Sequence, residues 1–499
     1  MFRNTLAQAL ELVVSTVTSL LLAPIMLSQL GLARFGVWSV VGALALYATL
    51  LDAGIARSLS RFVALHAARG DHRRVQECMG LGLLAVTAVG VVLVPVSWFG
   101  APLLEPSTRG LLTLQETRLV LLGVAAIFVG QAYAGVIVSL PHGLQRMMAP
   151  NLATIAGTIV NFAVSVAVLL ATDSLVVYAW ANAASGVVTI ALVLAVARAI
   201  WGRAVARPPS LGVVREVLGY SVRVQTTWVA DLVTMSAGRV LVGLLVSVEA
   251  AGAFALGSSI ATAIRQVGII TVSALVPTAT HEIVHGGHEA VRRLFRRYAP
   301  LSLGLSMPVF ALGALSAPFI VMAWLGESPP DTVAVLVALC VGFAANVMTG
   351  VPTSLWLADG HPGQVSTNAI ITAAVSLALS LALAPVLGLW GVLLATVAAL
   401  VALGVVLIAK FMRFYAVTLG DLRRAFLRPI LLAVGVAAPL APLVVVAAEH
   451  ARDRPAALAL GAAVAAAYGL PYWLLAERLQ LLPEQLTRAG LRRRVAAWR

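Results

Sequence analysis

Charged residues are scarce in this sequence. Asp, Glu, Lys and Arg make up only 11% of its 499 residues, whereas soluble globular proteins carry roughly 25%. Hydrophobic residues account for 61%, so most of the chain must face lipid or other apolar helices. This composition excludes an ordinary soluble protein and predicts an all-α membrane protein.

Cysteine is also nearly absent. Cys78 and Cys340 are the two cysteines in the chain. One is expected near a cytoplasmic loop and the other inside a helix, so we predict no disulfide. The first apolar run, Thr5 to Leu30, is too long for a signal peptide and lacks a small-residue cleavage site after a short core. We therefore expect it to remain as a membrane helix.

Long apolar runs dominate the rest of the chain. A membrane-spanning helix needs about 20 predominantly apolar residues. On that rule the sequence predicts about 14 spans, with Pro and Gly at several of the joins between them. The predicted spans are 5–30, 36–61, 79–100, 117–140, 149–172, 175–199, 217–247, 252–280, 298–325, 332–357, 364–386, 388–414, 429–449 and 455–477.

Acidic residues are fewer than basic ones, 20 against 34, which gives a net charge of +14. With the N-terminus placed inside, 25 of the basic residues fall in cytoplasmic segments, five in external segments and four within spans. Such a bias sets the orientation of membrane proteins. It predicts that both termini are cytoplasmic and that the basic loops contact anionic membrane lipids. No nucleic-acid partner is expected.

An internal repeat predicts the architecture. The segment Leu30 to Val75 has an echo 216 residues later, in which Gly36 is matched by Gly252. Helices 1–6 and 7–12 both begin inside, so the halves are expected to be parallel six-helix repeats that form two lobes, with two helices appended. The predicted domains are an N-lobe at 1–200, a cytoplasmic linker at 201–216, a C-lobe at 217–416, and helices 13–14 with a basic cytoplasmic tail at 417–499.

Two stretches carry a resemblance to a known family. They are LGLARFGVWSVVGALALYATLLDAGIARSLSRFVA, from Leu30, and VSVEAAGAFALGSSIATAIRQVG, from Val246. Together with the six-plus-six-plus-two pattern, they resemble the polysaccharide transporter (oligosaccharide or O-antigen flippase) family of the multidrug/oligosaccharidyl-lipid/polysaccharide exporter superfamily. The resemblance covers roughly residues 1–416.

The resemblance implies a multi-pass flippase of the bacterial inner membrane. Its expected substrate is a polyprenyl-pyrophosphate-linked oligosaccharide, moved from the cytoplasmic to the outer leaflet for lipopolysaccharide or other cell-surface polysaccharide biosynthesis. Two lobes would alternate access to a central cavity. A polysaccharide polymerase or glycosyltransferases of the same pathway are the expected protein partners, and no cofactor is expected.

Arg265 is the most informative charge within a span. A charge in an apolar helix is costly and marks a functional site by default. A guanidinium matches anions with two hydrogen bonds, so pyrophosphate fits. A structural ion pair with Asp231 is the alternative, and the two roles are compatible. Gln225 and Trp228 could contact sugar, although polar residues also serve ordinary helix–helix contacts.

The remaining intramembrane charges have weaker signals. Arg57 and Arg223 lie near the cytoplasmic ends of their spans, where they would meet the pyrophosphate first. A pair between Arg57 and Glu11 is the alternative. Arg239 lies near the outer end of its helix and is a further substrate-binding candidate. Asp52 is either a carboxylate for ion coupling or a partner of one of these arginines.

The motif His281-Glu282-Ile283-Val284-His285 matches the zinc metalloprotease pattern HExxH. It lies at a helix end that runs into Gly286, and the equivalent loop of the first repeat lacks it. We therefore predict a solvated helix end, without a metal site.

Two other functions are alternatives to a flippase. A membrane glycosyltransferase or polymerase would need catalytic groups on a sizeable external loop, and the longest external segment, 100–117, offers no dense cluster. A drug or cation antiporter of the same superfamily would favour cavity carboxylates over arginines. The excess of intramembrane arginine favours an anionic substrate. We expect a transporter and not an enzyme.

Overall fold

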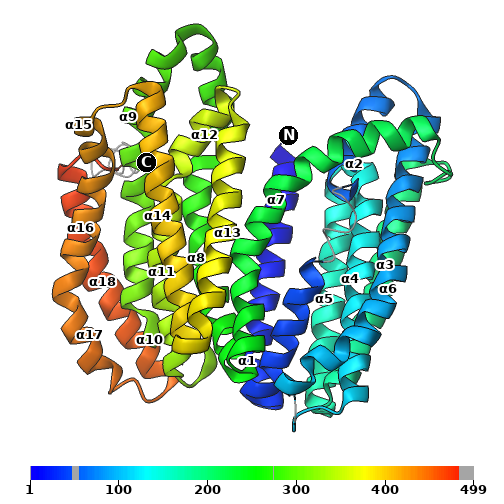
Figure 1. The fold of residues 1–499 in the computed structure, drawn as a ribbon, viewed down its shortest axis with the longest axis horizontal. Helices are drawn as coiled ribbons and strands as arrows, with labels where there is room; N and C mark the ends of the chain where they lie inside the picture. The colour runs from blue at the N-terminus through cyan, green and yellow to red at the C-terminus, as the bar shows by residue number, and fades with distance from the viewer. Residues whose placement is uncertain (1, 48–54, 109, 274, 483–499) are drawn as a thin grey trace, which may run out of the picture. The chain divides into compact units, whose positions relative to one another are not determined.

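The computed structural model describes residues 2–47, 55–108, 110–273 and 275–482, apart from some side chains within the helices. These residues form helices joined by turns and contain no β-strand. They divide into two compact units, Met1–Gly252 (unit 1) and Ala253–Arg499 (unit 2) (Figure 1). The boundary at Gly252 places the whole of α7 in unit 1. The lobe boundaries proposed from the sequence stay a prediction.

Unit 1 is built from long apolar helices. The first of them contains a break at Gly31, whose φ of 74° and ψ of 165° are not helical. The sequence predicted a turn at 31–35, and the structure shortens that turn to this one residue. The helices are α1 (Phe2–Tyr47), α2 (Ile55–Ala68), α3 (His72–Thr108), α4 (Leu114–Gly143), α5 (Met148–Ala171), α6 (Leu175–Trp201) and α7 (Leu211–Leu245).

Unit 2 begins at Ala253, near the start of α8. Its longest helix, α9, is broken at Gly287, where φ is 53° and ψ is −145°. Its other segments include two short helical turns of π and 3₁₀ type within the last apolar hairpin. The elements are α8 (Val248–Ser273), α9 (Leu275–Leu315), α10 (Ala317–Leu325), α11 (Pro330–Met348), α12 (Gly350–Ala358), α13 (Pro362–Leu387), α14 (Leu389–Tyr415), α15 (Leu419–Leu422), η2 (Arg423–Leu427), α16 (Arg428–Ala437), η3 (Ala438–Leu440), α17 (Ala441–Ala448) and α18 (Arg454–Arg478).

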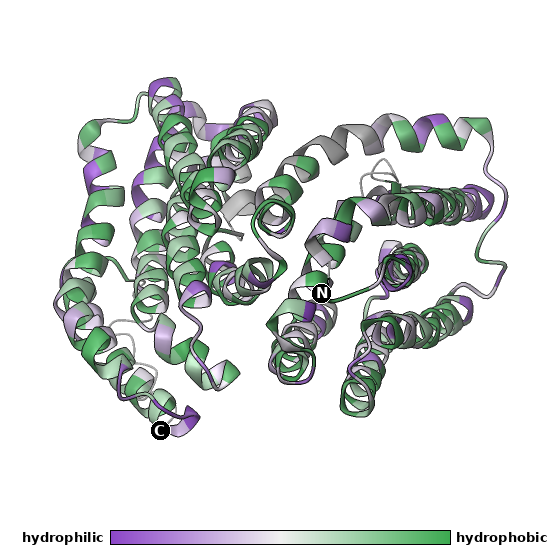
Figure 2. Ribbon diagram, turned by 60° about the horizontal axis from the view of Figure 1, so that its bottom comes forward, coloured by the Kyte–Doolittle hydropathy of each residue, from purple (hydrophilic) through white to green (hydrophobic). Residues whose placement is uncertain are grey.

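Within the described residues, 11 helical segments are long and apolar enough to cross a membrane. Figure 2 shows that hydrophobic residues dominate most helices and that hydrophilic stretches concentrate near helix ends. The first predicted span and the start of the second form the single segment Leu10–Tyr47. The predicted spans at 217–247 and 252–280 correspond to α7 and α8, which are not among the 11. The predicted total of 14 spans stays a prediction.

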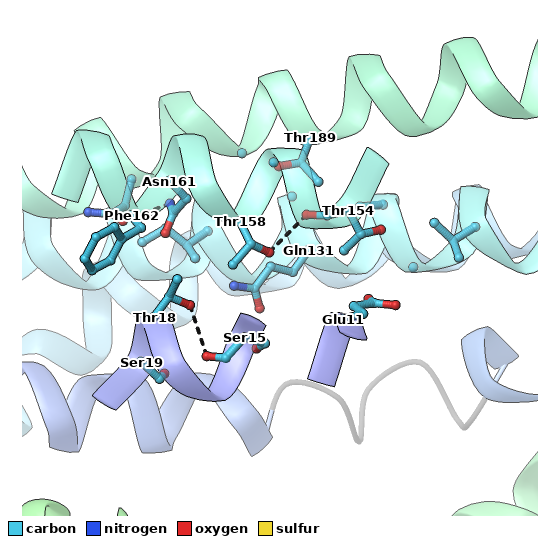
Figure 3. Close-up of a pocket in the computed structure, with 18 of the residues that line it drawn as sticks. Glu11, Ser15, Thr18, Ser19, Gln131, Thr154, Thr158, Asn161, Phe162 and Thr189 are labelled. Carbon is cyan, nitrogen blue, oxygen red and sulfur yellow. Dashed lines mark hydrogen bonds between the residues drawn. The ribbon is translucent and has the colours of Figure 1, made fainter. Parts of the chain in front are cut away.

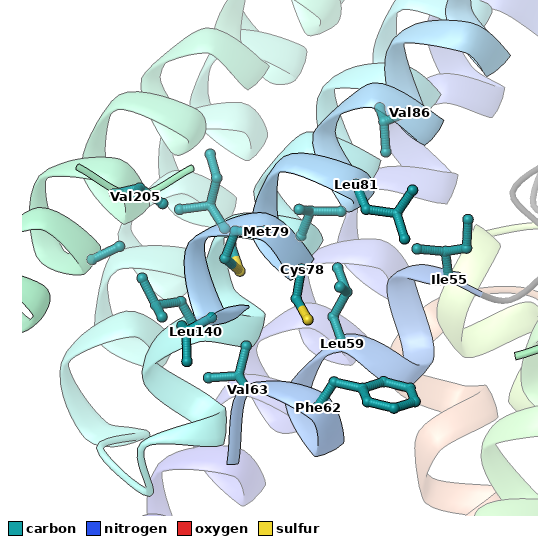
Figure 4. Packing of buried hydrophobic residues seen from close by; sticks show 14 of the residues in the cluster. Ile55, Leu59, Phe62, Val63, Cys78, Met79, Leu81, Val86, Leu140 and Val205 are labelled. Atoms are coloured by element: carbon teal, nitrogen blue, oxygen red, sulfur yellow. The ribbon is translucent and has the colours of Figure 1, made fainter. Parts of the chain in front are cut away.

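A tightly packed apolar cluster joins α2, α3 and α4 in unit 1 (Figure 4). Leu59 and Met79 within it are completely buried. A Cβ atom on Gly82 would lie 2.5 Å from Cδ1 of Leu59, so α3 approaches α2 through a glycine. Small residues permit such close helix packing in membranes, where van der Waals contact replaces the hydrophobic effect. The thiols of Cys78, in this cluster, and Cys340, in unit 2, are free and buried.

The segment between α6 and α7 is fixed to the start of α3. The buried carboxylate of Glu77 accepts hydrogen bonds from the hydroxyl of Ser210 at 2.5 Å and from Nε of Arg73 at 2.9 Å. The backbone N–H of Arg207 donates to the carbonyl of Gln76 at 2.9 Å. This segment is the predicted linker 201–216, and it is anchored to unit 1 along much of its length.

The two glycines matched by the repeat contact each other within unit 1. A Cβ atom on Gly36 would lie 1.7 Å from the carbonyl oxygen of Val248. A Cβ atom on Gly252 would lie 3.3 Å from the Cα atom of Gly36. The second half of α1 and the beginning of α8 therefore touch backbone to backbone, which only glycine at these positions allows.

Candidate functional site

Unit 1 encloses a polar cavity of about 490 Å³ between α1, α4, α5 and α6 (Figure 3). Its polar lining consists of six hydroxyl side chains, three amides and one carboxylate. These are Ser15, Thr18, Ser19, Thr154, Thr158 and Thr189, then Gln131, Asn161 and Asn182, and Glu11. The volume lies in the range of about 300–1,000 Å³ that is typical of ligand pockets.

Helical spacing explains why these side chains gather. On α1 the lining residues begin at Glu11 and recur after four, seven, eight and 11 positions. On α5 they begin at Thr154 and recur after three, four, seven and eight positions. Residues three or four apart share one face of a helix, so each helix turns one polar stripe inward. Polar groups within a membrane protein face an interior or a hydrated cavity because lipid cannot hydrogen-bond to them.

An amide and hydroxyl network holds the wall formed by α5 and α6. The side-chain N–H groups of Asn161 donate to Oδ1 of Asn182 at 2.9 Å and to Oγ of Ser185 at 2.7 Å. Ser165 donates to the same Oδ1 at 2.8 Å, and Asn182 donates to the carbonyl of Tyr178 at 2.8 Å. The network fixes the amide of Asn161 with its donors occupied, which leaves its side-chain oxygen as an acceptor at the cavity.

An ion pair connects two walls of the cavity. Arg34 on α1 contacts Asp173, in the turn between α5 and α6, with 2.6 Å between Nη1 and Oδ2. The hydrogen bond from the guanidinium lowers the pKa of the Asp173 carboxyl below its ordinary value. Both side chains are partly or largely exposed, so the pair orients the turn more than it stabilises the unit.

The hydroxyl groups of three cavity threonines, Thr18, Thr154 and Thr158, donate to helix backbone and keep lone pairs to accept further hydrogen bonds. Thr18 donates to the carbonyl of Val14 at 2.8 Å. Thr158 donates to the carbonyl of Thr154 at 3.0 Å. Gln131 makes no side-chain hydrogen bond to any described residue, and Figure 3 shows it between Thr158 and Ser15. The site therefore offers several acceptors and one free amide to a polar ligand.

Arg265, the leading candidate from the sequence, lies in unit 2 on α8. Its Nε donates to Oδ1 of Asn346 at 3.2 Å, and the guanidinium carbon lies 5.5 Å from the ring centroid of Phe343. A Cβ atom on Gly268 would lie 2.9 Å from Cγ2 of Val347, so α8 packs closely on α11 here. A neutral amide and an aromatic face thus help to orient the guanidinium.

The other sequence candidates differ in how much the structure describes. Glu11 lines the polar cavity, and Arg239 is half-buried on α7. Asp52 lies outside the described residues. Five further candidates have side chains outside the described part of the chain. Whether they bind substrate or form ion pairs therefore stays a prediction. These are the side chains of Arg57, Arg223, Gln225, Trp228 and Asp231.

The HExxH stretch lies on α9 just before the break at Gly287, which confirms the predicted helix end. Glu282 and His285 are exposed, and the side chain of His281 lies outside the described residues. His288 follows the break, and its ring lies 5.0 Å from that of Tyr415. Among the described residues no three His, Cys, Asp or Glu side chains are placed to hold a metal.

Except for Glu11, the cavity residues were missed from the sequence. The available signal was the helical spacing of Ser, Thr, Asn and Gln in the spans that became α1, α4, α5 and α6. Each stripe is weak alone, because hydroxyl residues are common in membrane helices and often bond to their own backbone. The polar residues form a site only because the folded helices bring their polar faces together around one cavity.

Comparison with known proteins decides the family. The model of a family described as polysaccharide biosynthesis proteins matches residues 1–281, more than half of the chain. The chain belongs to this family. No curated protein gives a significant match.

Solved structures share the fold of this polysaccharide biosynthesis protein family member. The lipid II flippase MurJ in an inward closed conformation is similar with a TM-score of 0.65 at 10% identity, over 96% of this chain and 100% of that one. An inward-facing multidrug resistance MATE transporter of the MOP superfamily has a TM-score of 0.63 at 16% identity, over 82% and 94% of the two chains. The chain is therefore a multi-pass membrane protein with a transporter fold.

Proposed function

We propose that this protein moves a polyprenyl-pyrophosphate-linked oligosaccharide from the cytoplasmic to the outer leaflet of the bacterial inner membrane by alternating access. The family match carries the proposal, because it joins polysaccharide biosynthesis to a transporter fold. The N-terminus, the α6–α7 segment and the C-terminus are taken to be cytoplasmic, in line with the bias of basic residues.

Arg265 is assigned the pyrophosphate. Its guanidinium lies 17 residues into α8, about 26 Å from the start of the helix at 1.5 Å per residue. The residue also lies eight residues, about 12 Å, before the end of α8 at Ser273, so each end of the helix is more than two turns away. Asn346 and Phe343 orient the planar group, and neither of these two side chains carries a charge. A planar fork of donors matches two phosphate oxygens at once.

The membrane potential favours export of such a substrate. Moving one charge through 100 mV is worth about 2.3 kcal/mol. A diphosphate with about two negative charges would gain roughly 4–5 kcal/mol on leaving a negative interior. An ion gradient is compatible with this mechanism but is not required by the charge movement.

Binding of undecaprenyl pyrophosphate to the purified protein in nanodiscs tests the assignment. Arg265→Ala should weaken binding about 10- to 100-fold, because a charge-assisted interaction is lost. The affinity of Arg265→Lys should lie between those of the wild type and Arg265→Ala, since lysine keeps the positive charge but lacks the planar pair of donors. Asn346→Asp should also weaken binding by placing a competing carboxylate on the guanidinium. Arg297→Ala, at an exposed position of the same unit, is the control and should bind as the wild type does.

Cation export is the second candidate, and Glu11 favours it. This carboxylate is the one ionisable group among the residues lining the cavity, and a cationic drug would seek it. Ethidium efflux that is lost on Glu11→Gln, together with wild-type binding of undecaprenyl pyrophosphate by Arg265→Ala, would replace the flippase proposal with this one.

A further inference from the structure

We infer that the polar cavity of unit 1 binds the saccharide part of the substrate as an uncharged, hydroxyl-rich ring system. The inference rests on the proposed function and adds a binding site to it. The lining supplies the argument: nine hydroxyl or amide side chains surround a space of about 490 Å³, with one carboxylate and no basic group. A pyrophosphate would find no cation among these residues, so the anionic part of the substrate does not belong here.

The donors and acceptors of the cavity match a polyol. A sugar hydroxyl is both a donor and an acceptor, and so is each Ser or Thr hydroxyl. Because Thr18 and Thr158 already donate to helix carbonyls, they present acceptors to ligand O–H groups. Gln131 adds an amide with donors and an acceptor, and Asn161 adds a fixed acceptor. Glu11 supplies the strongest acceptor at one end of the space.

Shape also favours a ring over an extended chain. Phe162 lines the cavity beside Asn161 (Figure 3) and gives an apolar face on which a sugar ring can lie. Gly130 and Gly186 also line it, and a Cβ atom at either position would meet no atom closer than 3.9 Å, so ligand atoms can approach the helix backbone closely there. A pocket lined by both polar groups and apolar surface suits the polar edge and the apolar face of a pyranose.

The unliganded cavity must be hydrated, because acceptors inside a membrane protein need partners. A saccharide would replace those waters with its own hydroxyls. This exchange gives specificity: a site built for hydroxyls leaves buried polar groups unpaired when the hydroxyls are absent. Lipid pyrophosphate without sugar should therefore bind more weakly than its glycosylated form.

Two lipids separate this inference from the proposed function. The probes are undecaprenyl pyrophosphate and the same lipid carrying one neutral N-acetylhexosamine, each titrated against the protein in nanodiscs. The test variants are Thr18→Val and Gln131→Leu, which remove hydrogen-bonding groups at nearly constant size. The matched control is Thr16→Val. Thr16 bonds to its own helix in the same way, through the carbonyl of Leu12 at 2.8 Å, but does not line the cavity.

The expected result is a wild-type preference for the glycosylated lipid that falls roughly three- to tenfold in each test variant. Binding of the sugar-free lipid should stay unchanged in both variants, and Thr16→Val should match the wild type throughout. The thermal stability of each variant is measured in parallel. A folding defect would lower the melting temperature and weaken binding of both lipids.

Three results would overturn the inference while leaving the proposed function intact. The first is equal affinity of the wild type for the two lipids. The second is an unchanged preference for the glycosylated lipid in Thr18→Val and Gln131→Leu. The third is a loss of this preference in Thr16→Val as large as in the two test variants. Failure of the wild type to bind either lipid would instead contradict the proposed function itself. A sodium-dependent stabilisation lost on Glu11→Gln, without a sugar preference, would assign the cavity to a cation.

Discussion

Replacing Gly36 by alanine tests the backbone contact between α1 and α8 most sharply. The new Cβ atom would lie 1.7 Å from the carbonyl oxygen of Val248, and real Cβ contacts essentially never fall under 3.0 Å. The two helices must therefore separate by at least 1.3 Å, the difference between these distances. Because the obstacle is backbone, no side-chain rotation relieves it.

The expected cost is that of overpacking, about 1–3 kcal/mol. At roughly 2–4 °C per kcal/mol for a unit of this size, the melting temperature should fall by roughly 2–12 °C. Gly42→Ala is the matched control, since its Cβ atom would meet no described atom within 4 Å. Both variants gain the same helix propensity, about 1 kcal/mol. The difference between their melting temperatures therefore reports the steric clash at Gly36 alone.

Thermal unfolding of the two variants in detergent, followed by size-exclusion chromatography, gives the comparison. Gly36→Ala should lose the monodisperse peak at a lower temperature than Gly42→Ala. Equal melting temperatures, with wild-type lipid binding in both, would show that the helices are not in backbone contact at Gly36.

Three further predictions follow from the loops. Labelling of intact cells with a membrane-impermeant maleimide should modify a cysteine introduced at Ala451 but not one at Ala204; labelling at Ala204 would reverse the topology. Purified protein should contain no stoichiometric zinc, and zinc that disappears on His285→Ala would restore the metal site. Glu77→Gln should weaken the hydrogen bonds to Ser210 and accelerate tryptic cleavage of the α6–α7 segment severalfold; cleavage at the wild-type rate would show that Glu77 does not hold this segment.

The apolar runs predicted the helices well where turns are short. The spans predicted at 149–172 and 175–199 became α5 and α6 with shifts of at most two residues. Prediction failed where a helix extends past its apolar part. The start of α3 lies at His72, seven residues before the predicted span, because Arg73 and Glu77 continue the helix outside the hydrophobic window. Hydropathy marks the buried length of a helix and does not mark its caps.

The candidate site was predicted only in part. Arg265 and Glu11 stood out in the sequence because a charge in an apolar run is conspicuous. The structure places Glu11 at the cavity, and the role of Arg265 stays a prediction. The uncharged lining residues carry almost no signal in one dimension, since Thr and Ser are nearly neutral in hydropathy. These residues form a cavity only because the helix surfaces that carry them are turned toward one another. A single sequence does not show how helices are oriented in this way.

Lipid translocation in proteoliposomes measures the proposed flippase function most directly. A glycosylated undecaprenyl pyrophosphate is placed on one leaflet, and its arrival on the other is followed by periodate oxidation of the exposed sugar. Wild-type protein and Arg297→Ala should move the lipid at equal rates, while Arg265→Ala should insert normally and not move it. Translocation by Arg265→Ala at the wild-type rate would remove Arg265 from the mechanism. No translocation by the wild type would contradict the flippase function.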